Sequence, residues 1–361
     1  MNYKLLNFDH GNKYSGSFHV GPFKIEINDR HCQNLLHLPK DPSITFGHDD
    51  NYKKVIIENS KIEGSWIETA KVEIDDSELQ PSAIYPATSS KNSIDDLCLL
   101  LSFATGRIVS FEGDQFINHY NPDRHVDKVV HYGYFLRNNF CWKQLEFIKN
   151  DGLSTQFYYL IMAYQANDLV AKATYCNNAL NTAYDKFFKK NSIEFIKENV
   201  RSEIKCSVSK CLEENGIDKT IKEDILNRVN NTLQPSAIHK LKHFLKGINL
   251  YPEYDNAEMH KRLKWINDVR NLMAHTGTLP KDKKLSDSIL IEVVVSVISL
   301  VLRINQYYFG CKILKLNDPY LEYIRTLITN YFYKGEFSGR SIFSETHEAY
   351  MERVKREWLT E

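Results

Sequence analysis

Three polar residues near the end of one predicted helix, Arg270, Asn271 and His275, have the side-chain types that phosphodiester chemistry needs. At about 100° per residue, Arg270 falls at the centre of an apolar stripe, where a guanidinium needs an anionic partner, an interface or a substrate phosphate. Asn271 and His275 are four residues apart and share the neighbouring polar face. The negative end of the helix dipole is predicted to favour protonated His275, so that it exchanges protons near neutral pH. These types predict general acid–base cleavage of a phosphodiester.

The helix that must position these residues is predicted over residues 255–275. Asp255, followed three residues later by Glu258, is a capping signal, and Pro280 follows the predicted end. The apolar stripe consists of Met259, Leu263, Ile266, Met273 and Ala274, widened by Trp265, Val269 and Leu272. Asn267 and Lys264 lie one and two turns before Asn271, so polar groups are predicted to converge along this helix.

The segment DVRNLMAHTG, residues 268–277, resembles the RNxxxH motif of the HEPN superfamily of ribonucleases. The resemblance rests on Asn directly after Arg, Ala before His, Gly soon after, and the helical context, and it covers roughly residues 154–310. It implies that Arg270 contacts the scissile phosphate, that His275 transfers protons and that Asn271 orients the pair. It also implies a homodimer in which two motifs form one composite, metal-independent ribonuclease site.

The N-terminal half, with its β-rich start and a helix ending in LLSFATGR, resembles the sensor portions of ApeA-type HEPN proteins of antiviral defence. This resemblance implies a toxic effector. It also implies that the N-terminal region binds an unknown activating ligand or phage component.

A locally basic region surrounds the motif. The residues that we predict to bind RNA phosphates there are His260, Lys261, Arg262, Lys264 and Asn267. Lys240, Lys242 and Lys246 add to the basic character of the sequence before it. The competing interpretation for each lysine is an ordinary solvated helix face.

Two alternatives to a ribonuclease follow from the same residues. Arg270 and His275 would serve only structure in a catalytically inactive HEPN-type dimerisation or RNA-binding module. His239 and His243, four residues apart, would share a helix face in a metal-dependent hydrolase, but no acidic or cysteine partner lies at a useful spacing. We therefore predict no metal and no cofactor.

The predicted fold class is α+β, with a β-rich N-terminal domain followed by an all-α, HEPN-like bundle. FHVGPFKIEI, KKVIIE and SWIETAKVEI predict strands within residues 3–75, and IVSF at 108–111 predicts another. A helix is predicted from Ser93 to before Gly106. Because Gly and Pro become sparse from residue 154, we predict domains at 1–150, a sensor or regulatory domain, and 151–361, a ribonuclease domain with a C-terminal helical extension.

Capping signals and apolar periodicity divide the second domain into helices. The predicted helices are 154–189, one beginning at Asn191 with Glu194, one beginning at Thr220 with Glu223, a short one ending at Gly247, 255–275 and 285–308.

Composition limits the partners and the location. Lys plus Arg and Asp plus Glu both total 46, so any RNA site must be a local patch. The N-terminus lacks a signal pattern, and the apolar run Ile289–Leu302 is shorter than the roughly 18 residues of a spanning helix. We therefore expect a cytoplasmic protein without a membrane segment. Its seven cysteines, with no CxxC pair, predict reduced thiols.

Overall fold

The computed structural model describes thirteen stretches of the chain. They are residues 1–9, 15–31, 43–49, 52–58, 68–78, 93–112, 129–130, 142–150, 152–166, 169–191, 195–276, 287–337 and 340–341. Several element ends, among them 272–276 and 287–292, are described by their backbone only. The chain forms two compact units: the main unit, 1–182 with 252–361, and the insert unit, 183–251.

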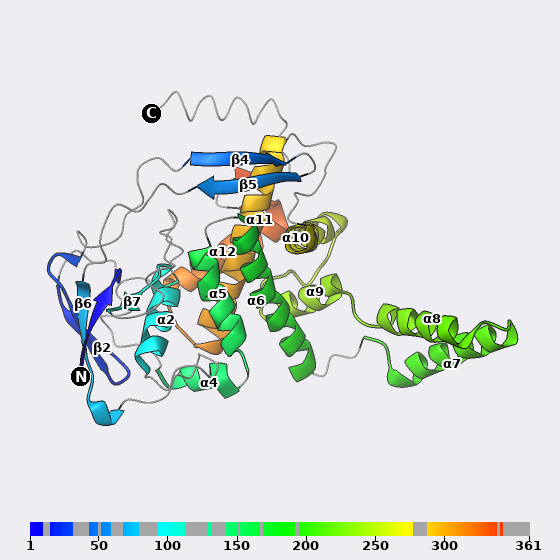
Figure 1. The fold of residues 1–361 in the computed structure, drawn as a ribbon, viewed down its shortest axis with the longest axis horizontal. Helices are drawn as coiled ribbons and strands as arrows, with labels where there is room; N and C mark the ends of the chain where they lie inside the picture. Colours follow the sequence, from blue (N-terminus) through cyan, green and yellow to red (C-terminus); the bar gives the residue numbers. More distant parts are fainter. Residues whose placement is uncertain are drawn as a thin grey trace. The chain divides into compact units, whose positions relative to one another are not determined.

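The N-terminal region of the main unit is an antiparallel sheet (Figure 1). Its strands, in spatial order, are β2 (Ser17–Val20), β3 (Phe23–Ile27), β6 (Glu68–Glu73), β1 (Asn2–Leu6) and β7 (Ser110–Phe111). A separate hairpin pairs β4 (Ser43–Asp49) with β5 (Tyr52–Glu58). Strand β3 alternates buried and half-buried residues, as expected where one sheet face packs on a core. The predicted strands of the first 75 residues are confirmed.

Helix α2 (Ser93–Thr105) lies against this sheet and is buried almost throughout, because its sequence is apolar on nearly all sides. Gly106, at φ 65°, follows its end as predicted. Asn7, at φ 60°, ties β1 to the chain after α2: its Nδ2 donates to the Ile108 carbonyl at 2.9 Å, and Arg107 donates to its Oδ1 at 2.8 Å.

The rest of the main unit is mostly helical, so the α+β class is confirmed. Its elements are η1 (Asp76–Glu78), η3 (Trp142–Gln144), α4 (Leu145–Asn150), α5 (Ser154–Gln165), most of α6 (Leu169–Lys190), α10 (Ala257–Thr276), α11 (Asp287–Tyr307), η4 (Tyr308–Ile313), α12 (Pro319–Lys334), β8 (Glu336–Phe337) and β9 (Arg340–Ser341). The insert unit contains the end of α6 with α7 (Glu198–Glu214), α8 (Lys219–Thr232) and α9 (Ala237–Gly247).

An aromatic cluster joins the N-terminal region to the helices. Phe103 of α2 lies 5.3 Å from Phe157 of α5 and 6.4 Å from Phe309 of η4, between ring centroids, and all three are buried. This core is continuous across residue 150. The division into a sensor or regulatory domain, 1–150, and a ribonuclease domain, 151–361, stays a prediction. The β-rich region and the bundle form one unit, and residues 183–251 form the other.

Two predicted helix boundaries are wrong. The predicted helix 154–189 is two helices, because the backbone adopts an extended conformation at Ala166 (ψ 123°). Ala166 is followed in the sequence by an Asn-Asp pair, and these residue types favour helix caps over helix interiors. Asn191 does not begin the next helix: its side chain donates to the Phe187 carbonyl at 2.8 Å, at the end of α6, and α7 starts at Glu198.

Helix α11 and the element after it extend beyond the apolar run Ile289–Leu302. Helix α11 continues into the π-helix η4, so the segment Val293–Ile313 is, among the described residues, one helix long and apolar enough to cross a membrane. Most of that segment is buried inside the protein.

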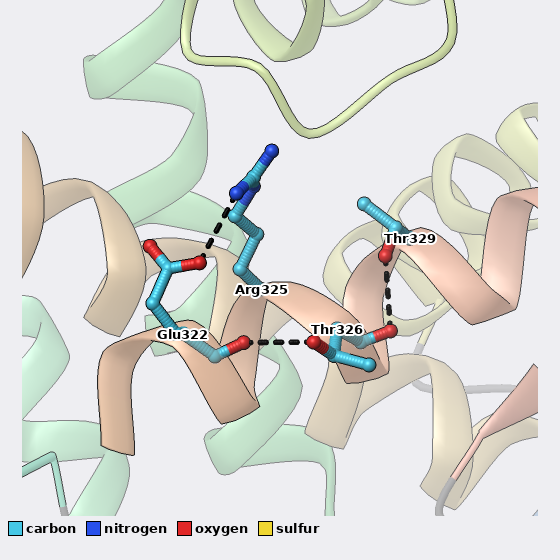
Figure 2. Close-up of polar contacts among 4 residues, drawn as sticks. All are labelled: Glu322, Arg325, Thr326 and Thr329. Atoms are coloured by element: carbon cyan, nitrogen blue, oxygen red, sulfur yellow. Dashed lines mark hydrogen bonds and ion pairs between the residues drawn. The ribbon is translucent and has the colours of Figure 1, made fainter. Parts of the chain in front are cut away.

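Helix α12 was not predicted in detail. Asp318 caps its start by accepting from the Tyr320 amide at 2.8 Å. Polar side chains on its outer face interact with one another and with the helix backbone (Figure 2). Arg325 forms an ion pair with Glu322 at 3.1 Å, and the Thr326 hydroxyl donates to the Glu322 carbonyl. The opposite face buries Leu321, Ile324, Ile328, Tyr331 and Phe332.

Replacement of Phe103 tests the continuous core. Phe103→Ala is expected to lower the free energy of unfolding of the main unit by about 3–5 kcal/mol, because it removes a fully buried ring. Phe147→Ala, which removes a ring that is 55 % exposed, is the matched control and should cost less than about 0.5 kcal/mol. Denaturant unfolding checks both values. Equal effects of the two substitutions would contradict the assignment of this core.

Candidate functional site

Helix α10 carries the predicted motif, and its start is set by Asn256. The Asn256 side chain accepts from the Met259 amide at 2.9 Å, so the cap lies one residue after the predicted Asp255. Met259, Leu263, Ile266 and Val269 are buried. These positions recur every three to four residues and fix the rotation of the helix, as the apolar stripe predicted.

The three motif residues differ in their surroundings. Arg270 follows the buried Val269 and is itself half-buried, and within the described part of the chain the structure gives its guanidinium no hydrogen bond or ion pair. Asn271 is exposed. His275 lies in the last turn of α10, but its side chain is outside the described residues. The structure therefore places all three residues on one unbroken helix.

Four of the predicted polar residues follow one face of α10. His260, Lys264, Asn267 and Asn271 are spaced by four, three and four residues, so they line up along the helix. All are exposed except Asn267, which is half-buried. Lys261 is exposed about 100° away from His260. This arrangement suits contacts with a chain of phosphates, since lysine ammonium groups and amides both reach phosphate oxygens.

Arg262, also predicted to bind RNA, makes a hydrogen bond inside the protein. Its Nη1 donates to the Phe332 carbonyl at 2.5 Å, and the Tyr331 hydroxyl donates back to the Arg262 carbonyl at 2.9 Å. This reciprocal pair, which we call the α10–α12 clamp, joins the motif helix to the end of α12. Burial raises the pKa of Tyr331, so its hydroxyl stays a donor.

Gly335 makes room for this clamp. It caps α12 at φ 72°, and a Cβ there would lie 3.2 Å from Nε and Nη2 of Arg262. The Lys-Gly pair at 334–335 is a helix-end signal readable in the sequence. The sequence does not show, however, that Gly335 lies against the side chain of Arg262, 73 positions earlier in the chain.

His239 and His243 lie in the insert unit, on α9, and form an aromatic cluster. Their ring centroids are 4.5 Å apart, Phe195 lies 4.6 Å from His239, and Phe188 lies 5.8 Å from His243. No group of three potential metal ligands occurs among the described residues. The nearby Lys240 is paired with Asp185 at 2.6 Å. These ring contacts give the histidine pair a packing role.

The clamp generates a prediction about stability. Arg262→Met is expected to lower the free energy of unfolding by about 1–3 kcal/mol, because it removes a charged donor from a buried helix end. Lys261→Met, one residue earlier and exposed, should change it by less than about 0.5 kcal/mol. Thermal and denaturant unfolding of both variants are the measurement. If Lys261→Met were the more damaging change, the contact would be misassigned.

The histidine cluster generates a prediction about pH. Burial lowers the pKa of His239 from 6.5, and the charges of His243 and Lys242 lower it further; burial and then Lys246 and Lys242 lower the pKa of His243. The folded insert unit thus binds fewer protons than the unfolded chain, so its stability is present above pH 6.5 and is lost as the pH falls below that value.

Hydrogen exchange of residues 183–251 between pH 5 and pH 8 measures this loss. The double variant His239→Gln/His243→Gln should show a flatter pH profile, whereas His260→Gln, an exposed histidine of α10, should leave the profile unchanged. A wild-type insert unit that is equally protected at both ends of the range would contradict the prediction.

Comparisons with known proteins were made at the level of families, individual proteins and structures. No family model, curated protein or solved structure matches the chain.

Proposed function

We propose that this protein is a metal-independent endoribonuclease of the HEPN type, in which two copies combine their motifs into one site. The observation that carries the proposal is the sequence Arg270, Asn271 and His275 on the last two turns of one unbroken helix, α10. The buried stripe of α10 supports it, because a helix held in one rotation presents these residues in a fixed order.

The proposed reaction is an internal transfer within RNA. The 2′-oxygen attacks the adjacent phosphorus, the bond from phosphorus to the 5′-oxygen breaks, and a cyclic phosphate and a free 5′-hydroxyl are the products. A base must take the proton from the 2′-hydroxyl, and an acid must give one to the leaving oxygen. Two copies of His275 would supply the base and the acid, and Arg270 would stabilise the charge on the non-bridging oxygens.

The surroundings of Arg270 favour an external anion as its partner. A half-buried guanidinium keeps its charge, and it has no anionic partner within the described residues. A phosphate at this position would satisfy it. The exposed His260, Lys264 and Asn271 on the neighbouring face would then hold the flanking phosphates.

The N-terminal sheet would act as the sensor of a toxic defence effector. The Phe103, Phe157 and Phe309 cluster supports this role, because a ligand bound to the N-terminal region would act on the same packed core as the helices of the bundle.

Cleavage of a mixed RNA pool by purified protein in excess chelator tests the proposal. His275→Ala should lower the rate by about 10²–10⁴-fold, the usual contribution of one general acid or base. Arg270→Lys should remain badly impaired, because an ammonium cannot reproduce a bidentate contact to phosphate. Asn271→Ala should have a smaller effect if that side chain only orients its neighbours.

Two controls separate the proposal from its alternatives. Tyr254→Ala, at a 90 % exposed position outside the motif and outside the predicted RNA-binding residues, should cleave RNA at close to the wild-type rate. An inactive RNA-binding or dimerisation module would bind RNA equally well with and without His275 and would not cut it. Full activity of His275→Ala, or loss of wild-type activity to the chelator, would show the mechanism to be wrong.

A further inference from the structure

Helices α7 and α8 form a hairpin in the insert unit that buries none of its residues. The two helices contain 17 and 14 residues, lie side by side and are all described (Figure 1). Lys222 of α8 pairs with Glu213 of α7 across the hairpin. Apolar side chains nevertheless recur along both helices, and two helices that bury nothing are marginal in water without a further surface to pack on.

The two sides of the hairpin differ in chemistry. One side is a shallow groove lined by Lys205, Cys206, Ser209, Leu226, Asn227 and Asn230. The other, which we call the apolar face, carries Val200, Ile204 and Val208 of α7 and Ile221, Ile225 and Val229 of α8, each set spaced by four residues. Val200 is 39 % exposed and Ile221 is 55 % exposed. The other four are half-buried.

The charge of the hairpin argues against a nucleic acid as the missing partner. Residues 195–233 contain equal numbers of basic and acidic residues. The seven basic residues are Lys197, Arg201, Lys205, Lys210, Lys219, Lys222 and Arg228, and the seven acidic residues are Glu198, Glu203, Glu213, Glu214, Asp218, Glu223 and Asp224. The net charge of this segment is zero. RNA requires an excess of positive charge, whereas a neutral surface of mixed sign does not repel its own copy.

The size and ends of the apolar face suit a second hairpin. Two adjacent helices about 25 Å long and about 10 Å wide each offer roughly 500 Å² per copy, so two copies bury about 1,000 Å², the lower limit for a specific interface. Val200 lies at one end of the hairpin and Ile221 near the other. A two-fold axis across the face would bring each Val200 to the Ile221 of the second copy, and cover both.

We infer that the apolar face of the α7–α8 hairpin packs against the same face of a second copy of this chain, forming a four-helix bundle across a two-fold axis. This interface goes beyond the proposed ribonuclease site, uses none of its residues and exists whether or not the protein cleaves RNA. An interface of about 1,000 Å² predicts association of modest strength, which depends on protein concentration.

Two native cysteines on opposite sides of α7 report on the interface. Cys211 follows Val208 by three residues and so borders the apolar face, whereas Cys206 lines the groove; both are exposed. Alkylation of full-length protein, read for each cysteine by peptide mass spectrometry, should be equally fast at both when the protein is dilute. At about ten times the dissociation constant, mass action should slow labelling of Cys211 by about 5-fold while Cys206 stays reactive.

Ile221→Glu should abolish this protection, because pairing would bury carboxylates on an apolar surface. The substitution leaves α8 intact, since a negative charge in the first turn of a helix is favourable. Asn227→Glu adds the same charge on the groove side and should leave the protection unchanged. Circular dichroism confirms that both variants keep their helices.

Three results would overturn the inference. The first is equal alkylation rates of Cys211 and Cys206 up to several hundred micromolar protein. The second is protection of Cys211 that persists in the Ile221→Glu variant. The third is protection of Cys211 that appears only when RNA is added. None of these measurements uses RNA cleavage, so failure of the ribonuclease proposal and failure of this interface are distinguishable.

Discussion

Burial of one side of α10 is the constraint on which the candidate site depends. Met259, Leu263, Ile266 and Val269 are withdrawn from water, and they hold the helix in one rotation within the main unit. Arg270 then falls within the packed side, where it is half-buried, and Asn271 falls on the open side. A rotation of one residue would exchange these positions, so the packing of apolar side chains determines which polar groups of α10 are open to solvent.

The α10–α12 clamp adds a second restraint of a different kind. Apolar packing resists rotation of α10, whereas the hydrogen bonds between Arg262 and the end of α12 are directional and restrain its position along the axis. Gly335 suits the clamp, because its φ of 72° disfavours other residues and a Cβ there would crowd the guanidinium at 3.2 Å. Residues far apart in the chain thus support the helix that carries the motif.

The main unit and the insert unit are stabilised in different ways. The main unit has a continuous core in which aromatic rings from α2, α5 and η4 meet. In the insert unit, α7 and α8 bury no residue, and a small aromatic cluster lies around Phe244 and the histidine pair. Such a unit is expected to open locally more readily than the main unit, because fewer of its side chains are buried.

Local signals in the sequence determined the α+β class, the strands of the N-terminal sheet, the helix Ser93–Thr105 and the helix that carries Arg270, Asn271 and His275. Periodicity, glycines and capping residues act over a few positions, so they are readable without a fold. The break at Ala166 and the use of Asn191 to end α6 depend on local residue types and contacts that compete with the apolar periodicity, so periodicity alone did not predict them. The capture of Arg262 by α12 was decided by the tertiary structure, because the carbonyl that it binds belongs to Phe332, 70 positions later in the chain. The division of the chain into a main unit and an insert unit belongs to the same class, since only the folded protein shows which side chains share a core.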